Sequence, residues 1–147
     1  MQSVWSSVLT VKSPWDIDWL KRLTLMFDYT TGHEHDGNGP KQNTNWDGLA
    51  SYARYLITDK LAVATRFEYF NDNDGDRTSA ASGIAAPRPS TPVYLQEWTT
   101  TLEYPFVDDL IARLEYRKDW ANDNFFQEDA RRRKDQDLIL AELIYLF

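Results

Sequence analysis

Hydrophobic and polar residues alternate along seven stretches of the chain, and almost no stretch repeats with the 3.6-residue period of a helix. In residues 112–120, ARLEYRKDW, every second side chain from Arg113 to Asp119 is charged, and the residues between are mostly apolar or aromatic. Because successive side chains of a strand point to opposite faces, this pattern predicts a strand with one charged and one apolar face. The predicted strands span residues 3–12, 19–31, 46–58, 61–71, 93–106, 110–120 and 136–147. The alternation therefore predicts an all-β fold, with residues 1–147 forming a single β-barrel domain or barrel segment.

The connections between these strands alternate strictly between short and long. SPWDID, TDK and FVDD are short, whereas residues 31–45, 72–93 and 121–136 are long and polar. In an antiparallel up-and-down sheet, alternate connections emerge at the same end, so all the long ones would lie together. Outer-membrane barrels have short periplasmic turns and long extracellular loops, whereas a soluble sheet has no physical reason for this asymmetry. The spacing therefore favours an antiparallel up-and-down transmembrane β-barrel with its long connections on the cell exterior.

The two faces of such strands would meet different surroundings, a wet lumen on the charged face and lipid on the apolar face. Lys118 is the exception, because it falls on the lipid face. A lysine there costs about 2–4 kcal/mol at the midplane but little near the interface, where its long side chain can reach the headgroups. The mixed signs on the other face indicate paired charges that shape the lumen, and not a single-sign filter. The predicted lumen-lining residues are Arg22, Asp28, Arg54, Arg66, Glu68, Glu97, Glu103, Arg113, Glu115, Arg117 and Asp119.

Aromatic residues collect near the ends of the predicted strands, where amphipathic rings sit at a membrane interface. The last strand also alternates up to a terminal phenylalanine, which is characteristic of bacterial barrels. A simpler explanation is that aromatic residues are common in strands of every kind. The predicted interface aromatics are Trp5, Tyr29, Trp46, Tyr69, Trp98, Tyr104, Trp120, Tyr145 and Phe147.

Composition narrows the function classes further. The chain of 147 residues carries a formal net charge of -7, which argues against a general nucleic-acid binder. It contains no cysteine, so disulfides and thiolate metal sites are excluded. No apolar run approaches the roughly 18 residues of a spanning helix, although hydropathy would also miss the short alternating strands of a transmembrane barrel.

Three polar motifs contain the residue types of binding sites, and none is predicted to carry chemistry. HEHD at 33–36 offers metal-ligating side chains, but in a Gly-rich loop it is more often solvated. NDNDGDR at 71–77 does not fit the calcium loop of an EF-hand and favours a polar turn. RRRK at 131–134 has the charge to bind lipopolysaccharide phosphates, although a solvated charge run is the favoured interpretation. We therefore expect no enzyme, no cofactor and no metal.

Three segments resemble the closing part of the porin-2, OmpL-like family of outer-membrane β-barrel proteins. The resemblance covers residues 44–147 well and 1–43 loosely, and it implies a bacterial outer-membrane barrel that is taken to be a porin, without catalytic residues. The residues that carry it are Trp46, Gly48, Tyr52, Arg54, Tyr55, Arg66, Glu68, Tyr69, Asp72, Gly75, Glu103, Tyr104, Arg113, Glu115, Tyr116, Arg117, Asp119 and Phe147. The last strand departs from the pattern, because its lumen side is apolar at Leu138, Leu140, Ile144 and Leu146, with Glu142 where a small residue is usual.

Three functions remain open from the sequence. The leading hypothesis is a porin-like barrel that passes small hydrophilic solutes and contacts outer-membrane lipid and lipopolysaccharide. The second is a structural barrel that holds a partner of an envelope complex, and the third is a soluble β-barrel that binds a small ligand, with its faces inverted. We also expect an incomplete barrel, the C-terminal part of a larger one, because seven strands place the two ends of the chain on opposite sides, whereas single-chain bacterial barrels have an even number. At least one further strand would precede Met1 or come from another chain.

Overall fold

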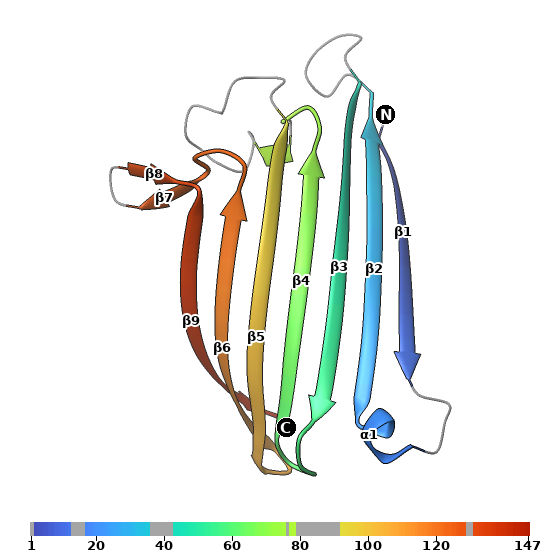
Figure 1. Cartoon of the computed structure of the whole chain (residues 1–147), viewed down its shortest axis with the longest axis vertical. Coiled ribbons are helices and arrows are strands. Elements are labelled where there is room, and N and C mark those ends of the chain that lie inside the picture. Colours follow the sequence, from blue (N-terminus) through green and yellow to red (C-terminus); the bar gives the residue numbers. More distant parts are fainter. Residues whose placement is uncertain (1, 13–16, 36–42, 76, 79–91, 129–130) are drawn as a thin grey trace.

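The computed structural model describes residues 2–12, 17–35, 43–75, 77–78, 92–128 and 131–147. Seven long strands form one antiparallel sheet in the order β1-β2-β3-β4-β5-β6-β9, so each strand pairs with the next long strand of the chain (Figure 1). These strands are β1 (Gln2–Lys12), β2 (Leu23–Glu34), β3 (Thr44–Leu56), β4 (Ala62–Asp72), β5 (Val93–Val107), β6 (Leu110–Ala121) and β9 (Asp135–Tyr145). The expected all-β, antiparallel up-and-down arrangement is confirmed.

Three short elements were not predicted, because each is too short for a periodic pattern. A one-turn helix, α1 (Asp18–Lys21), replaces the start of the predicted 19–31 strand, and its Lys21 and Asp18 side chains lie 3.8 Å apart. Strands β7 (Phe126–Glu128) and β8 (Arg131–Arg133) form a separate hairpin within the long connection 121–136. No helix in the described part of the chain is long and apolar enough to cross a membrane.

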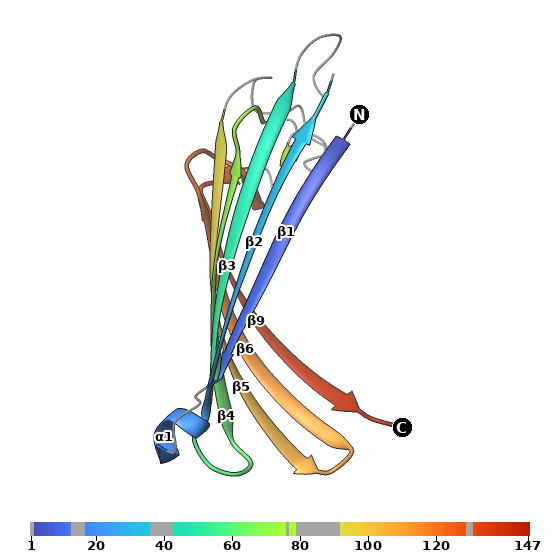
Figure 2. The same ribbon diagram turned by 90° about the vertical axis from the view of Figure 1, so that its right-hand side faces the viewer.

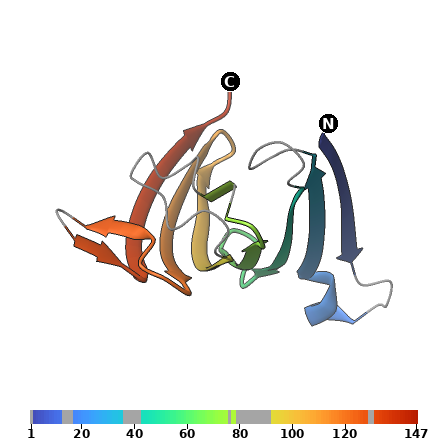
Figure 3. The same ribbon diagram turned by 90° about the horizontal axis from the view of Figure 1, so that it is seen from above.

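The sheet is long, twisted and curved, and it is not closed. Seen from above it forms an arc with β1 and β9 at its two edges (Figure 3), and the side view shows the strands crossing near the middle and spreading apart at both ends (Figure 2). The strand ends that flank the long connections lie together at the upper end in Figure 1, and the short turns lie at the lower end. The asymmetry that the sequence predicted is therefore an asymmetry of the folded sheet.

The register assigns every strand residue to one of two faces. The register places four residues side by side across β3 to β6, namely Tyr52, Arg66, Thr99 and Arg117, and we call the face that carries them the concave face. In each strand every second residue shares this face, and the residues that alternate with them form the convex face. Every buried residue of the described strands lies on the concave face: Gly32, and eight residues with side chains, namely Thr44, Ala62, Asp72, Val93, Glu97, Thr99, Asp119 and Ala121. Only three of these eight side chains are apolar, so the described strands bury a mainly polar layer in place of a hydrophobic core.

Candidate functional site

The predicted lumen-lining residues gather on the concave face. Ten of them lie within strands and share that face in the register. The eleventh, Arg22, directly precedes β2 at the short-turn end, where its guanidinium donates to the Leu56 carbonyl and lies 3.3 Å from the Asp59 carboxylate. The structure thus brings ten of the eleven to one face of the sheet, and their role in lining an aqueous lumen stays a prediction.

Glu97 on β5 is the centre of the first charge network. Its Oε1 accepts hydrogen bonds from Arg66 Nε at 3.0 Å and from Thr99 Oγ1 at 2.7 Å, while its Oε2 lies 2.7 Å from Arg117 Nη2. Arg117 Nε in turn donates to Asp119 Oδ1 at 2.8 Å. Glu97 is only 6% exposed and Asp119 only 3%. Because both carboxylates are removed from water, each depends on these donors for its solvation.

The arginines separate carboxylates that the register places side by side. Glu68, Glu97 and Asp119 are direct cross-strand partners, an arrangement of like charges that is destabilising by itself. Arg66 precedes Glu68 by two residues in β4, and its guanidinium contacts both Glu68 and Glu97. Arg117 precedes Asp119 by two residues in β6, and its guanidinium contacts both Glu97 and Asp119. The mixed signs seen in the sequence are therefore arranged as paired charges, as predicted.

Glu103 organises a second network nearer the short turns. Its two oxygens lie 2.7 Å from Arg54 Nη2 and 2.9 Å from Arg113 Nη2. Arg54 belongs to β3 and Glu103 to β5, so the arginine side chain crosses the whole width of β4. It can do so because β4 carries the small residues Ala62 and Ala64 at this level of the concave face. A bulky side chain at either alanine would obstruct this path.

A groove of about 550 Å³ lies on the concave face between the two networks. Its walls carry both signs of charge together with hydroxyl groups, including Thr24, Thr101, Arg54 and Glu115. Thr101 Oγ1 donates a 2.7 Å hydrogen bond to Glu115 Oε2. The lining also includes the apolar side chains of Met26, Ala62 and Ala64. Four hydrogen-bond partners of the concave carboxylates were not predicted as site residues, namely Tyr52, Thr99, Thr101 and Gln136. Alternation alone nevertheless places them on the charged face.

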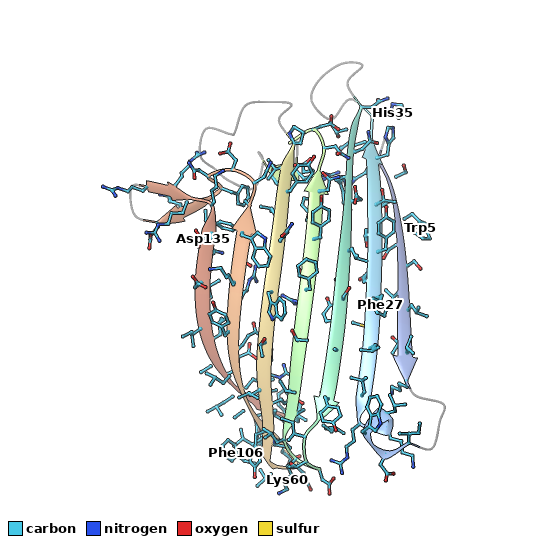
Figure 4. The ribbon with its side chains drawn as sticks, viewed as in Figure 1. Trp5, Phe27, His35, Lys60, Phe106 and Asp135 are labelled. Carbon is cyan, nitrogen blue, oxygen red and sulfur yellow. The ribbon has the colours of Figure 1, made fainter. Side chains whose placement is uncertain are left out.

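The convex face has the opposite character. Large apolar and aromatic side chains on it are more than a third exposed, among them Phe27, Leu49, Phe67, Trp98, Leu102, Leu114, Ile139 and Leu143. Lys118, the exception in the sequence, lies 3.5 Å from the Asp135 carboxylate and 3.3 Å from that of Asp137, which also accepts a 2.5 Å hydrogen bond from Tyr116. Figure 4 shows Asp135 at the upper end of β9, far from Phe106 and Lys60 at the lower end. Lys118, the one lysine or arginine that the described strands carry on this face, is thus paired close to one end.

The predicted interface aromatics fall mainly on the convex face. Trp5, Tyr29, Tyr69, Trp98, Tyr104, Trp120 and Tyr145 all lie there, and Phe147 follows β9. Trp46 does not share this face, and its predicted role as an interface aromatic stays a prediction. It lies on the concave face opposite Gly32, whose missing side chain leaves room for the indole, because a Cβ there would come within 2.3 Å of the ring.

The polar motifs occupy ordinary positions in the fold. His33 lies in β2, with its Nδ1 2.6 Å from Asn45 Oδ1, and the rings of His33 and His35 meet edge to face. Asp36 of the same motif lies outside the described residues. Within the described ranges, no group of three or more histidine, cysteine, aspartate or glutamate side chains is arranged to hold a metal ion. In the basic run, Arg133 lies 2.5 Å from the Glu128 carboxylate across the β7–β8 hairpin.

Comparison with known proteins agrees with this geometry. The family model described as "Putative beta-barrel porin-2, OmpL-like" matches residues 15–147, nearly the whole chain. No curated protein and no solved structure matched the chain. The match extends to the N-terminal side of residue 44, where the sequence resemblance was loose. The chain therefore belongs to the OmpL-like, beta-barrel porin-2 family.

Proposed function

We propose that this chain forms a porin-like β-barrel wall in the bacterial outer membrane, through which small hydrophilic solutes pass by diffusion. The observation that carries the proposal is the inversion of the two faces. A soluble sheet buries its apolar face and exposes its polar one, whereas here the charged concave face is the crowded one and the apolar convex face is exposed. Hydrocarbon is the surrounding in which such a convex face is stable. A porin role is non-enzymatic, and it requires no catalytic residue.

The height of the apolar region on the convex face supports a membrane location. On three strands, polar residues mark the two ends of this apolar region. The upper ends are marked by Asp47 in β3, Gln96 in β5 and Lys118 in β6, and the lower ends by the turn residues Asp59, Asp108 and Asp109, respectively. The members of each pair are about nine to twelve residues apart, which is roughly 30–40 Å along a strand. Strands tilted by about 35–45° would then span roughly 21–33 Å along the membrane normal, a range that includes the thickness of a hydrocarbon layer.

The edges of this apolar band run obliquely across the strands. Through the register, Gln96 aligns with Leu49, two residues below Asp47, and Lys118 aligns with Ser51, two residues further down. The upper edge thus descends about 13 Å over three strand spacings of about 4.8 Å. That slope corresponds to about 40°, the tilt that strands adopt in outer-membrane barrels. The lower edge slopes in the same sense, since Tyr55 aligns with Leu102 and the aspartates follow four and six residues later.

Lipid contacts extend this proposal to partners. The convex apolar band would meet hydrocarbon, while Lys118 and the basic hairpin β7–β8 lie at the end of the sheet that we assign to the cell exterior. Guanidinium groups are the side chains that best match phosphate geometry. We therefore expect lipopolysaccharide phosphates to contact Arg131 and its neighbours.

One observation favours a second candidate, a structural barrel that holds an envelope partner. On the concave face, β9 presents Leu138 and Leu140, which are about 40% exposed, where the neighbouring β6 presents Arg117 and Glu115. This apolar strip on a charged surface fits an apolar segment of another protein. In that case the passage would be occupied and closed to solutes.

Planar-bilayer recording tests the proposal. The folded protein, added to a bilayer from detergent, should produce discrete conductance steps if it forms an open passage. A scaffold filled by a partner segment should produce none. Monodisperse behaviour in plain buffer without detergent would eliminate both membrane functions, since a soluble protein cannot expose the convex face described above.

A further inference from the structure

Glu115 is the only carboxylate in the described lining of the groove that no arginine neutralises. Glu103 lies close to two arginines, and Glu142 lies 3.9 Å from Arg113. The Oε2 atom of Glu115 accepts the 2.7 Å hydrogen bond from the Thr101 hydroxyl, whereas no described residue donates to its Oε1 atom. The negative charge of Glu115 is therefore free to attract a cation that enters the groove.

The arginines on either side of Glu115 in β6 are engaged elsewhere. Arg113 and Arg117 lie two residues before and after it and share its face. Arg113 Nε donates a 2.9 Å hydrogen bond to Glu103, and Arg117 belongs to the network around Glu97. That network already has three carboxylates for its two arginines. Neither flanking arginine is therefore left over to pair with Glu115.

Aliphatic side chains lie directly beside this carboxylate. Leu140 on β9 is the cross-strand partner of Glu115, and Leu138 is the diagonal neighbour on the same face. Both leucines are about 40% exposed. An ammonium group would pair with the carboxylate by charge-assisted hydrogen bonds, while the carbon atoms attached to it would cover the leucines and remove apolar surface from water. An inorganic cation would gain only the first of these contacts, and an anion would be repelled.

We propose that Glu115 and Leu140 form a subsite for alkylammonium groups at the edge of the groove. The groove of about 550 Å³ has the size of sites that hold small molecules, and the Thr24 and Thr101 hydroxyls in its lining suit the polar remainder of such a solute. The preferred solutes are therefore hydrophilic molecules that carry an aliphatic amine. Their passage rests on the proposed function, whereas their binding does not.

A single cysteine in place of Leu138 measures the charge of the subsite. The chain has no other cysteine, and a diagonal neighbour lies about 7–8 Å from Glu115. The full chain carrying Leu138→Cys, folded in lipid vesicles, is labelled at about 0.02 M salt with methanethiosulfonate reagents of opposite charge. Adding Glu115→Gln should lower the ratio of the cationic to the anionic labelling rate about fourfold, because one unit charge is removed at that distance.

Protection of the same cysteine measures binding of the probe n-butylammonium. At a concentration that half-occupies the subsite, n-butylammonium should slow labelling by uncharged N-ethylmaleimide about twofold, and methylammonium at the same concentration should slow it less. Glu115→Gln should abolish the protection. Leu140→Ser should weaken it while leaving the charge ratio unchanged, because it removes the aliphatic contact and keeps the carboxylate.

Asp28→Asn is the matched control, because it removes an equal charge from the same face. The Asp28 carboxylate accepts hydrogen bonds only from hydroxyl groups among the described residues, as Glu115 does, and it lies on β2, five strand spacings or about 24 Å from β9. It should change the charge ratio at the Leu138→Cys thiol less than about twofold. An equal fall with Asp28→Asn and Glu115→Gln, no fall with Glu115→Gln, or equal protection by n-butylammonium and methylammonium would overturn the subsite.

Planar-bilayer recording separates the subsite from the proposed function. If the chain conducts, the current carried by n-butylammonium relative to potassium should fall in Glu115→Gln. Absence of conductance together with the expected labelling and protection would refute the proposed function and keep the subsite. Discrete conductance steps with labelling that Glu115→Gln leaves unchanged would refute the subsite and keep the proposed function.

Discussion

Replacing Glu97 by glutamine should destabilise the sheet more than replacing Glu142, although both carboxylates lie on the concave face. The Glu97 carboxylate is buried and joins Arg66, Arg117 and Thr99, so it links three strands at one point. Glutamine keeps the length and the polar end of the side chain. It removes the charge and replaces one of the two acceptor oxygens with an NH2 group, which cannot accept a hydrogen bond from an arginine. The change therefore isolates the charge network from packing.

The magnitude follows from burial. Removing one partner of a fully buried ion pair costs about 3–5 kcal/mol. Here the two arginine side chains are 33% and 36% exposed, and each keeps a second carboxylate, Glu68 or Asp119. Water and these remaining partners compensate a large part of the loss. We therefore expect about 1–2 kcal/mol for Glu97→Gln.

Urea unfolding of the protein folded in lipid vesicles, followed by tryptophan fluorescence, measures this difference. The control is Glu142→Gln, because Glu142 is more than half exposed and lies 3.9 Å from Arg113, so its replacement should change the free energy of unfolding by less than about 0.5 kcal/mol. Glu103→Gln should lie between the two. Equal midpoints for Glu97→Gln and Glu142→Gln, with equal slopes, would show that the buried network does not stabilise the sheet.

Three further outcomes test the faces, the topology and the packing. Leu114→Asp on the convex face should impair membrane assembly, whereas Thr101→Asp on the concave face should be tolerated; equal assembly of the two variants would contradict the orientation. Gly32→Ala should lower stability by about 1–3 kcal/mol in the same urea assay, because the new methyl group would overlap the Trp46 ring. Gly48→Ala is its control, since a Cβ there meets its neighbours at ordinary contact distance, and an equal effect would refute the packing argument. Protease added to intact cells should cut first in the long connections, and cleavage only after the outer membrane is broken would reverse the topology. The expected cleavage ranges are the parts of these connections outside the seven long strands, 35–43, 73–92 and 122–134.

The strands and their faces were predictable because alternation is a local property of the sequence. A residue two positions along a strand always returns to the same face, so the charged set from Arg113 to Asp119 defined the side of its neighbours. The same rule identifies the predicted interface aromatic that lies on the concave face. Trp46 has the parity of Tyr52 and Arg54 in its strand, so its position on the concave face was readable, and its place near a strand end was the weaker signal.

The charge partners were less predictable, since they depend on register between strands that no local pattern specifies. Asp137 meets Lys118 because they are direct partners in the β6–β9 ladder, which requires knowing how the last strand aligns. Arg54 meets Glu103 across an intervening strand, which requires in addition the side-chain conformations and the small size of Ala62. Sequence alone could place these residues on one face but could not pair them.

The absence of an apolar core among the described strands changes what the charge networks must do. In a soluble domain, burial of apolar side chains supplies most of the favourable free energy, and a buried ion pair adds little. In this sheet most of the large exposed apolar side chains lie on the convex face, so the concave face contributes mainly backbone ladders and polar contacts. Glu97 and Glu103 each hold two arginines from different strands, and the concave side chains are thereby fixed relative to one another. A polar interior of this kind can remain ordered beside water, which is what a passage for hydrophilic solutes requires of its wall.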